Sequence, residues 1–366
     1  MSESAFKNMI NPAVVKKISK VFHEVYPEFN EKRFHKLSVK LADLELKQRV
    51  LAITDGLRAE LPGKYPDDTK LIARVLAKKK LSGFELWPIS EYISQYGTEH
   101  FDESLELMYQ LTQQFTSEFA VRAFLQKDPH RILKKFKSWV KDENVHVRRW
   151  ISEGSRPLLP WAAKIHSFIK KPETLHLLEE LKYDPELYVR KSVANHLNDI
   201  SKHHPDLVVS TLKEWVKKSP KLHLDNIHWI KKHALRTLIK KGHKNALGLM
   251  GANHKFDVMV NSLKFDKKKY VMGDHLEFEF NLESTSKKPQ QLIVDYLIGF
   301  VKSNGTIVFK VFKLKNFELV PGERIVIKKR HSLKKITTMT FYPGQHQLGI
   351  QVNGKVLMTA SWMFNP

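Results

Sequence analysis

The chain has 366 residues and carries 62 Lys and Arg residues against 39 Asp and Glu residues, a net charge of +23 with His neutral. This excess favours a polyanionic partner, with nucleic acid first and an acidic membrane surface second. Residues 255–366 hold 18 Lys and Arg and 9 Asp and Glu, so both the last third (+9) and the remainder (+14) are basic. The chain has no cysteine, which excludes disulfides, thiolate zinc sites and cysteine nucleophiles.

No segment of the sequence is suited to cross a membrane. The amino terminus lacks the apolar stretch of a signal peptide. The longest apolar stretches, such as Leu292–Val301, are too short and too polar to span a bilayer. We therefore expect a cytoplasmic protein without a membrane partner. The length suggests two domains, and nothing in the sequence points to an oligomer, so we expect a monomer.

Residues 1–245 have the pattern of successive helices. The first, Asn11–Tyr26, opens with an Asn-Pro pair that suits a cap and a first helical turn, and its apolar residues recur at a spacing of three to four. Two helices are expected within Asn30–Ala59. Further helices are expected at Thr69–Lys79, Trp87–Tyr96 and Asp102–Phe115.

A repeat of about forty residues emerges from about residue 116. Segments starting at Asn144, Glu186 and Asn226 each have a polar start, an apolar residue and then a basic pair. The basic pairs are Arg148-Arg149, Arg190-Lys191 and Lys231-Lys232. This period is typical of HEAT or armadillo arrays, in which the second helices line one concave face. We expect a ladder of basic pairs there that suits a phosphate backbone; the alternative is that acidic residues of neighbouring units neutralise them.

The pattern changes near Gly242, where a glycine-rich linker precedes segments in which apolar residues alternate with period two. Turn signals such as Asn304-Gly305 and Asn353-Gly354 separate these segments. About seven short strands over roughly 110 residues are typical of an immunoglobulin-like sandwich. The sequence therefore predicts a HEAT-like helical-repeat domain at residues 1–248 and a separate β-sandwich at residues 255–366. The expected strands are Phe256–Val260, Leu276–Phe280, Ile307–Phe312, Arg324–Lys328 and His346–Val352.

Four segments resemble the AlkC/AlkD superfamily of DNA alkylation-repair glycosylases: Ser117–Arg122, Arg148–Pro157, Leu159–Trp161 and Asn195–Asp199. With the added β-domain, the chain resembles the AlkC branch that has an immunoglobulin-like carboxyl-terminal domain, and the resemblance covers essentially the whole chain. It implies a monofunctional DNA glycosylase of base excision repair that releases cationic N3-alkylated bases, such as 3-methyladenine and 3-methylcytosine, from duplex DNA. It also implies no metal or organic cofactor, and a bacterial protein that is nucleoid-associated when bound to DNA.

A cationic base is already a good leaving group, so such an enzyme needs mainly a carboxylate that stabilises the oxocarbenium-like sugar and positions water. Glu118, at the start of a helix, matches the family's acidic position and is our first candidate; the alternative is a charge that favours the helix dipole. Glu153 is a second candidate carboxylate, or a partner that holds Arg148 or Arg149. Asp199 is a third, as a water ligand or as the partner of a lysine.

Two tryptophans flank a loop that Pro157 and Pro160 stiffen. Trp161 resembles the family's aromatic wall at the lesion. Trp150 is either a second lesion contact or a residue packed between helices. We expect phosphate contacts from Arg148, Arg149, Arg156, Arg190, Lys191 and Lys231.

The densest basic cluster of the β-domain is Lys328, Lys329 and Arg330. It either grips the duplex or forms a solvated face. An inert helical-repeat module that binds nucleic acid or protein remains the alternative to the enzyme. The two hypotheses differ at Glu118, which the enzyme needs uncovered and near Trp161, whereas a binding module can bury it in an ion pair.

Overall fold

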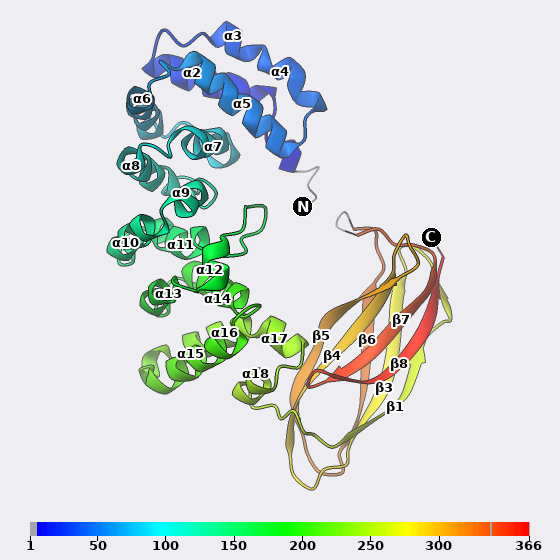
Figure 1. The fold of residues 1–366 in the computed structure, drawn as a ribbon. Coiled ribbons are helices and arrows are strands. Elements are labelled where there is room, and N and C mark those ends of the chain that lie inside the picture. Colours follow the sequence, from blue (N-terminus) through cyan, green and yellow to red (C-terminus); the bar gives the residue numbers. More distant parts are fainter. Residues whose placement is uncertain (1–5, 337–338, 366) are drawn as a thin grey trace. The chain divides into compact units, whose positions relative to one another are not determined.

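The computed structural model describes residues 6–336 and 339–365, and it consists of a helical part followed by a β-sandwich (Figure 1). Internal contacts divide the chain into two compact units. Unit 1 holds the residues up to His203 together with Pro220–His233, and unit 2 holds His204–Ser219 together with Ala234 onwards. Unit 2 therefore combines the sandwich with three of the last helices. No helix in the described part of the chain is long and apolar enough to cross a membrane.

The helices of unit 1 follow the amphipathic pattern of the sequence. Asn11 caps the first of them, α2, because its side chain accepts hydrogen bonds from the backbone N–H groups of Ala13 and Val14. The expected helix Trp87–Tyr96 is present with those bounds. The helices of unit 1 are α2 (Pro12–Val25), α3 (Glu31–His35), α4 (Leu37–Lys40), η1 (Leu41–Asp43), α5 (Leu46–Glu60), α6 (Tyr65–Ala77), η2 (Gly83–Leu86), α7 (Trp87–Tyr96), α8 (Phe101–Thr112), α9 (Val121–Lys127), α10 (Pro129–Trp139), α11 (Val145–Gly154), α12 (His166–Lys170), α13 (Leu175–Leu181), α14 (Leu187–Ile200), η3 (Lys221–His223) and α16 (Leu224–Ala234, whose last residue belongs to unit 2).

The helices of unit 1 stack as two-layer repeats, as the sequence period predicts. In Figure 1, α6, α8, α10 and α13 form one layer, and α7, α9, α11 and α14 form the other. Contacts run within a layer, as between α11 and α14, and between layers, as between α10 and α11. The helical-repeat fold is thus confirmed.

Two repeats have an arginine at the same position, and each arginine donates a hydrogen bond to the loop that precedes its helix. Arg148 Nη1 donates to the backbone oxygen of Asp142 at 2.8 Å, and Arg190 Nη1 donates to that of Asp184 at 2.7 Å. Each aspartate in turn accepts a hydrogen bond from the backbone N–H two residues later, at Asn144 and at Glu186. The repeated basic position therefore reflects loop geometry within the array.

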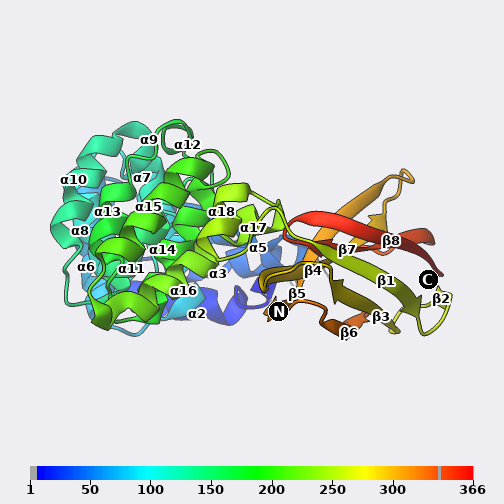
Figure 2. The same ribbon diagram turned by 90° about the horizontal axis from the view of Figure 1, so that it is seen from below.

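Unit 2 contains a β-sandwich of two sheets, which Figures 1 and 2 show from different sides. The sheet orders are β1-β3-β6 and β2-β8-β7-β4-β5. Side chains such as Phe280, Ile298 and Leu348 fill the core between them. The elements are α15 (Pro205–Lys218), α17 (Arg236–Lys240), α18 (Lys244–Leu249), β1 (Val258–Phe265), β2 (Lys269–Tyr270), β3 (His275–Ser284), β4 (Gln290–Val301), β5 (Ile307–Leu319), β6 (Arg324–Ser332), β7 (Gly344–Val352) and β8 (Lys355–Phe364).

The end of α17 packs against the sandwich within unit 2. Lys240 Nζ donates to the backbone oxygen of Val311 at 2.9 Å, and Gln351 Nε2 donates to the backbone oxygen of Lys240 at 3.1 Å. Gly242 and Gly354 both have positive φ and meet backbone to backbone, so that a Cβ built on Gly354 would lie 2.0 Å from the Cα of Gly242. Only glycine fits at this junction.

Candidate active site

Three carboxylates and two guanidinium groups of unit 1 form a row of alternating charge. Arg149 contacts Glu118 directly and lies 3.7 Å from Glu153. Arg156 continues the row, because its Nη1 lies 2.7 Å from Glu153 and its Nε lies 2.8 Å from Asp199. The structure therefore brings together the three carboxylates that the sequence singled out, with two of the expected phosphate-binding arginines between them.

Three successive parts of the array supply this row. Glu118 lies in the turn before α9, Arg149 and Glu153 lie one turn apart on α11, and Asp199 lies near the end of α14. Exposure falls along the row, from 13% for the side chain of Glu118 to 9% for Glu153 and 1% for Asp199. Glu118 is thus the carboxylate that solvent or a ligand reaches most easily.

Burial and charge compete at the two arginines. Burial disfavours the charged guanidinium of Arg149, but the carboxylates of Glu118 and Glu153 outweigh it, so the pKa of Arg149 is raised. At Arg156, burial is outweighed by the hydrogen bond that Arg156 donates to Asp199 and by the charge of Glu153, so the pKa of Arg156 is raised as well. Both arginines therefore stay charged and hold the carboxylates in place.

Further polar side chains orient the carboxylates. Thr116 Oγ1 donates to Glu118 at 3.0 Å, and Ser192 Oγ donates to Glu153 at 2.6 Å. Lys202 Nζ donates to Asp199 at 3.0 Å, as the alternative interpretation of that residue foresaw. Threonine and serine are common residue types, so the sequence gives no signal for this role of Thr116 and Ser192.

Tyr188 is an aromatic residue of the site that the sequence analysis did not identify. The Arg149 guanidinium lies 5.0 Å from the centre of its ring, and the residue is 43% exposed. A cation over an aromatic face is stabilised by the ring's electrons. Tyr188 stands two residues before Arg190, at the position where the preceding repeat has His146, and the centres of these two rings lie 5.8 Å apart.

The loop after α11 holds Trp161 out from the helices. Trp161 is 67% exposed and has a φ of +64°, a left-handed conformation that is uncommon for a residue with a side chain. The edge of its ring meets the ring of Phe6, with 6.0 Å between the ring centres. The structure thus places Trp161 at the surface, and its contact with a lesion stays a prediction.

Arg122 binds the backbone of this loop through its guanidinium group. It donates to the backbone oxygens of Ala163 at 2.7 Å, Arg156 at 2.8 Å and Gly154 at 3.2 Å. Burial and the nearby charge of Arg156 lower its pKa to about 10, so it remains charged at neutral pH. Arg122 belongs to one of the segments that carry the family resemblance, but the sequence analysis gave it no role.

Trp150 lies in the core and not at a surface. Its side chain is fully buried, and its ring centre lies 5.0 Å from that of Phe136 and 5.6 Å from that of Trp139. The expected contact with a lesion is therefore corrected in favour of the alternative, packing between helices.

The expected ladder of phosphate-binding residues is corrected at four positions. Arg148 is bound to Asp184 at 2.6 Å as well as to its own loop, and Arg190 is bound to its own loop. Arg149 and Arg156 are engaged by the carboxylates of the charge row. Acidic neighbours and carbonyl groups thus occupy these guanidinium groups, as the alternative interpretation held. Lys191 on α14 is exposed, whereas Lys231 on α16 is half-buried and burial lowers its pKa.

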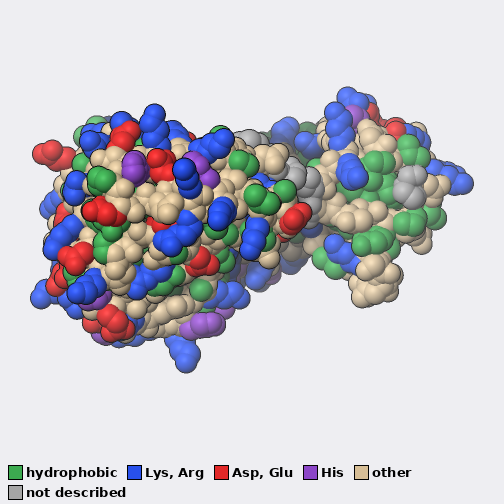
Figure 3. Space-filling view, turned by 90° about the horizontal axis from the view of Figure 1, so that it is seen from above, with side chains coloured by type: hydrophobic (Ala, Val, Ile, Leu, Met, Phe, Trp, Pro, Cys, Tyr) green, Lys and Arg blue, Asp and Glu red, His purple; other side chains and the backbone are tan. Residues whose placement is uncertain are grey.

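The basic cluster of the sandwich lies on β6. Lys328 and Arg330 are 76% and 63% exposed and pair across the strands with Glu279 at 3.0 Å and Glu277 at 3.1 Å of β3. Lys329, between them, is half-buried on the other face of the strand. In Figure 3, Lys and Arg side chains are spread over the visible surface among acidic ones.

His196 is a buried histidine whose two ring nitrogens both have partners within the protein. His196 on α14 is fully buried between the hydroxyl of Thr174, at 2.8 Å, and the backbone oxygen of Ser152, at 2.9 Å. Burial lowers the pKa of His196 to about 4, so it is neutral at pH 7. Within residues 6–336 and 339–365, no three His, Cys, Asp or Glu side chains cluster so that they could hold a metal ion.

Comparison with known proteins assigns both parts of the chain. Residues 98–236 match the family of the DNA alkylation repair enzyme, and residues 259–365 match the immunoglobulin-like domain at the carboxyl terminus of the uncharacterised protein YhaZ. The chain belongs to the DNA alkylation repair enzymes, in the AlkC branch that carries an immunoglobulin-like domain.

Two relatives cover nearly the whole chain. The uncharacterized protein YhaZ of Bacillus subtilis (strain 168) is 40% identical over 347 residues, which are 93% of this chain and 94% of that protein. A solved structure of the Pseudomonas fluorescens alkylpurine DNA glycosylase AlkC, bound to DNA containing an abasic site analog, is 38% identical with a TM-score of 0.90 and covers 99% of each chain. This similarity supports assignment of the chain as a DNA glycosylase with the AlkC fold.

Proposed function

We propose that this protein is a monofunctional DNA glycosylase that hydrolyses the N-glycosidic bond of cationic N3-alkylated bases, 3-methyladenine and 3-methylcytosine, in duplex DNA. The observation that carries the proposal is the row of carboxylates Glu118, Glu153 and Asp199, whose exposure falls from 13% to 1%. Its most exposed member, Glu118, is the group that we assign to the reacting sugar.

The reaction needs little from the protein beyond electrostatics. The bond between C1′ of the deoxyribose and the base nitrogen breaks, and its electron pair neutralises the cationic base. The oxygen of a water molecule then bonds to C1′, and the water proton passes to Glu118 and on to solvent. The carboxylate of Glu118 stabilises the positive charge that develops on the sugar during this step.

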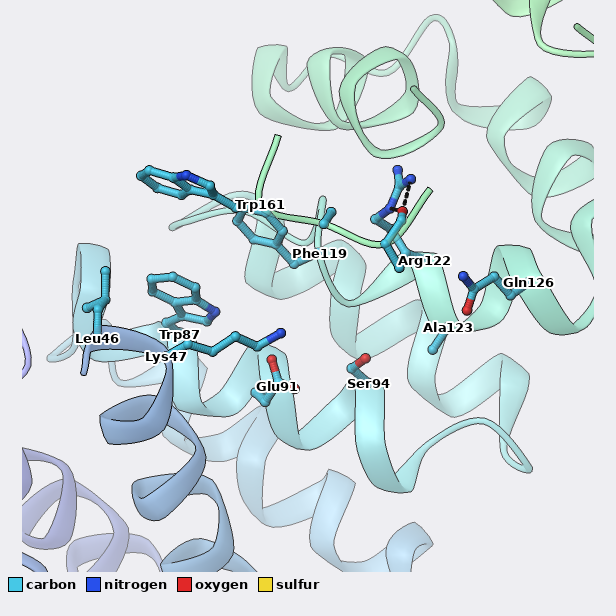
Figure 4. A pocket seen from close by; sticks show the side chains of 12 residues that line it. Leu46, Lys47, Trp87, Glu91, Ser94, Phe119, Arg122, Ala123, Gln126 and Trp161 are labelled. Atoms are coloured by element: carbon cyan, nitrogen blue, oxygen red, sulfur yellow. Dashed lines mark hydrogen bonds between the residues drawn. The ribbon is translucent and has the colours of Figure 1, made fainter. Parts of the chain in front are cut away.

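The other carboxylates act through the arginines between them. Asp199 is only 1% exposed, so we do not assign it to the substrate. It forms an ion pair with Arg156, and Arg156 forms a second ion pair with Glu153. In this assignment Glu153 is the second candidate for contact with the sugar, after Glu118, and Asp199 is a positioning residue. Trp161 offers an exposed aromatic face (Figure 4) to the cationic base or its sugar, a contact worth about 0.5–2 kcal/mol.

We assign duplex binding to exposed cations of both units. Lys191 and the pair Lys328 and Arg330 are exposed, and exposed Lys and Arg side chains release counterions when they neutralise phosphates. Because both parts of the sequence are basic, we propose that the protein binds double-stranded alkylated DNA. We also propose that it acts as a monomer in the bacterial cytoplasm and needs no cofactor.

One observation favours the alternative, a repeat module that binds nucleic acid or protein without catalysis. Glu118 is engaged by Arg149 in the free protein and is only 13% exposed. If this ion pair does not open on DNA, Glu118 is a structural residue and the chain is a binding module.

Incubation with methylated duplex DNA distinguishes these functions. We expect release of 3-methyladenine and 3-methylcytosine above the spontaneous rate, measured by chromatography of the freed bases. Release no faster than from DNA alone would rule out the glycosylase.

The variant Glu118→Gln tests the assigned carboxylate. It keeps the shape of the side chain but removes the charge, so we expect excision to fall by roughly 10²–10³ while DNA affinity changes little. Glu60→Gln is a matched control, because Glu60 is another carboxylate in an ion pair with an arginine, 3% exposed, in the amino-terminal helices. An equal loss of binding and excision in Glu118→Gln would make Glu118 structural.

A further inference from the structure

A basic groove of about 470 Å³ lies in unit 1, between α10 and the segment that leads into α13. We call it the α10 groove; its lining lies within residues 130–137 on one side and within residues 171–176 on the other. In Figure 1, α10 and α13 belong to the layer opposite the one whose helices α11 and α14 supply the row of carboxylates. The α10 groove is therefore separate from the candidate active site.

One wall of the α10 groove is a single face of α10. His130, Lys134 and Lys137 recur at spacings of four and three, which places them on one side of the helix, and all three are exposed. Leu133, which also lines the groove, is buried. At a rise of about 1.5 Å per residue, the three basic side chains extend over about 10 Å.

The opposite wall adds further basic side chains. Lys171 and His176 are exposed there, and Glu173 is half-buried. Glu173 is the carboxylate among the described residues of the lining, and it pairs with Lys171 at 2.9 Å. Because Lys171 already neutralises Glu173, the charges of Lys134 and Lys137 remain to attract an anion.

The other two cations of α10 have contacts outside the α10 groove. Arg131 Nη2 lies 2.8 Å from Asp102, and Lys135 Nζ lies 5.0 Å from the centre of the Trp139 ring. The helix thus separates cations that contact their neighbours from the two lysines that line the groove.

The surface charge of this layer changes from helix to helix. Helix α8 carries the carboxylates of Asp102, Glu103 and Glu106 and no Lys or Arg, whereas α10 carries four Lys and Arg residues and no Asp or Glu. The excess of cations on α10 is therefore local and does not simply reflect the basic composition of the chain. A local excess of one sign favours a partner of the opposite sign.

The α10 groove suits phosphate groups. The described residues of its lining include no Trp, Tyr or Phe on which a base could stack, so it offers charge and not base recognition. Each strand of duplex DNA places a phosphate about every 3.4 Å along the helix axis. Basic side chains spread over about 10 Å therefore match about three successive phosphates.

We propose that the α10 groove binds the phosphate backbone of a second DNA duplex, while the first lies at the row of carboxylates. One copy of the protein then holds two duplexes, one on each layer of the array. Because phosphate contacts carry no sequence information, the second duplex needs no lesion. Such a protein passes from one DNA segment to a neighbouring one without leaving DNA. The inference rests on the duplex binding of the proposed function but not on base excision.

Capture of a second duplex tests this inference. A duplex that contains an abasic-site analogue is immobilised and saturated with the full chain, unbound protein is washed away, and a fluorescent undamaged duplex is added at low salt. We expect the fluorescent duplex to be retained. Sedimentation of the same mixture in solution should show two duplexes with one copy of the protein.

The double variant Lys134→Gln with Lys137→Gln tests the assigned lysines. Two phosphate contacts are lost, so the affinity for the second duplex should fall about tenfold, and the slope of its logarithm against log salt should fall by about 1.8. The affinity for the immobilised duplex should stay the same. Lys16→Gln with Lys20→Gln is the matched control, because these two lysines are also exposed, lie four residues apart on α2 and carry the same charge.

A second duplex that is retained, and is lost in the α10 variant but not in the α2 variant, supports the proposal. Binding of one duplex only, an equal loss in both variants, or two copies of the protein in each complex overturns it. A protein that excises bases but captures no second duplex would keep the glycosylase and reject the α10 groove. Capture without excision would do the reverse.

Discussion

The two units of this protein differ in how many charged side chains they bury. Unit 1 buries Arg122, Arg156, Glu153 and Asp199 and joins them by hydrogen bonds between the repeats. The sandwich has an apolar core, with Asp295 as its buried carboxylate among the described residues. Repeat loops expose backbone carbonyl groups that side chains must satisfy, whereas strands satisfy theirs through the sheet ladder.

This difference affects what can be inferred from the excess of basic residues in the sequence. In the helical unit, Arg148, Arg156 and Arg190 are bound to carboxylates or carbonyl groups of the fold itself. In the sandwich, Lys328 and Arg330 also pair with carboxylates, those of Glu279 and Glu277, but they do so on an exposed sheet face. The ion pairs of the basic residues are therefore largely buried in one unit and open to solvent in the other.

The largest effect is expected from Arg156→Met. This change leaves Glu153 and Asp199 as buried carboxylates without their common partner, so the free energy of unfolding should fall by about 3–5 kcal/mol. Chemical denaturation of the full chain measures it. The matching change in the sandwich, Arg330→Met, should cost less than about 1 kcal/mol because the Arg330 pair is exposed. Similar losses in both variants would contradict the comparison.

A second prediction separates two tryptophans of the helical unit. Trp150→Ala removes a fully buried ring and should lower the free energy of unfolding by about 3–5 kcal/mol. Trp161→Ala should leave stability within about 1 kcal/mol but reduce excision, because its ring is exposed beside the assigned site. Thermal unfolding and base-release assays measure the two effects. A stable Trp150→Ala variant would argue against the core packing described above.

A third prediction concerns acid. Burial lowers the pKa of His196 and of His331 to about 4, so both are neutral in the folded protein and protonate more readily when unfolded. The stabilisation that each neutral histidine contributes is complete above about pH 6.5. It is lost as the pH falls toward 4, and the free energy of unfolding then drops by up to about 1.4 kcal/mol per pH unit for each histidine.

Asp295 acts in the opposite direction. Burial raises its pKa to about 6, so its contribution is complete below about pH 3.8 and is lost as the pH rises through 6. We therefore expect the loss of stability in acid to be shallower in His196→Asn and in His331→Asn than in the unchanged protein, because each replacement removes one group that protonates more readily in the unfolded chain. Denaturation midpoints between pH 4 and 7 measure these slopes, and slopes equal to those of the unchanged protein would contradict the assignment.

The smallest effect on stability is expected from replacing Lys328 and Arg330 by alanine. Both pairs are exposed, so the free energy of unfolding should change by less than about 1 kcal/mol. If these residues contact phosphates, the slope of log affinity against log salt should fall by about 0.9 for each lost contact. Fluorescence anisotropy at several salt concentrations tests this, and an unchanged slope would remove the pair from the interface.

Periodicity predicted the architecture better than it predicted the roles of single residues. The forty-residue repeat and the alternating strands are present, but β4 (Gln290–Val301) was not expected as a strand because it is buried on both faces and its apolar run hides the alternation. A repeat places Arg148 and Arg190 equivalently but does not say whether they turn outward or toward their own loops.

The site shows the same limit. Glu118 was assigned from the family resemblance, and Glu153 and Asp199 from their places in the repeat segments; the structure joins them through Arg149 and Arg156. Residues 31 and 43 positions apart meet there, and no local pattern encodes such distances.

The contact of Gly242 with Gly354 decides where the sandwich can be separated from the rest of the chain. A side chain on Gly354 would collide with the backbone of Gly242, more than a hundred residues earlier in the sequence. A fragment that began after α18 would lose this contact and the hydrogen bonds of Lys240. A piece of the chain that keeps them must therefore begin before Lys240 and include α18 together with the sandwich.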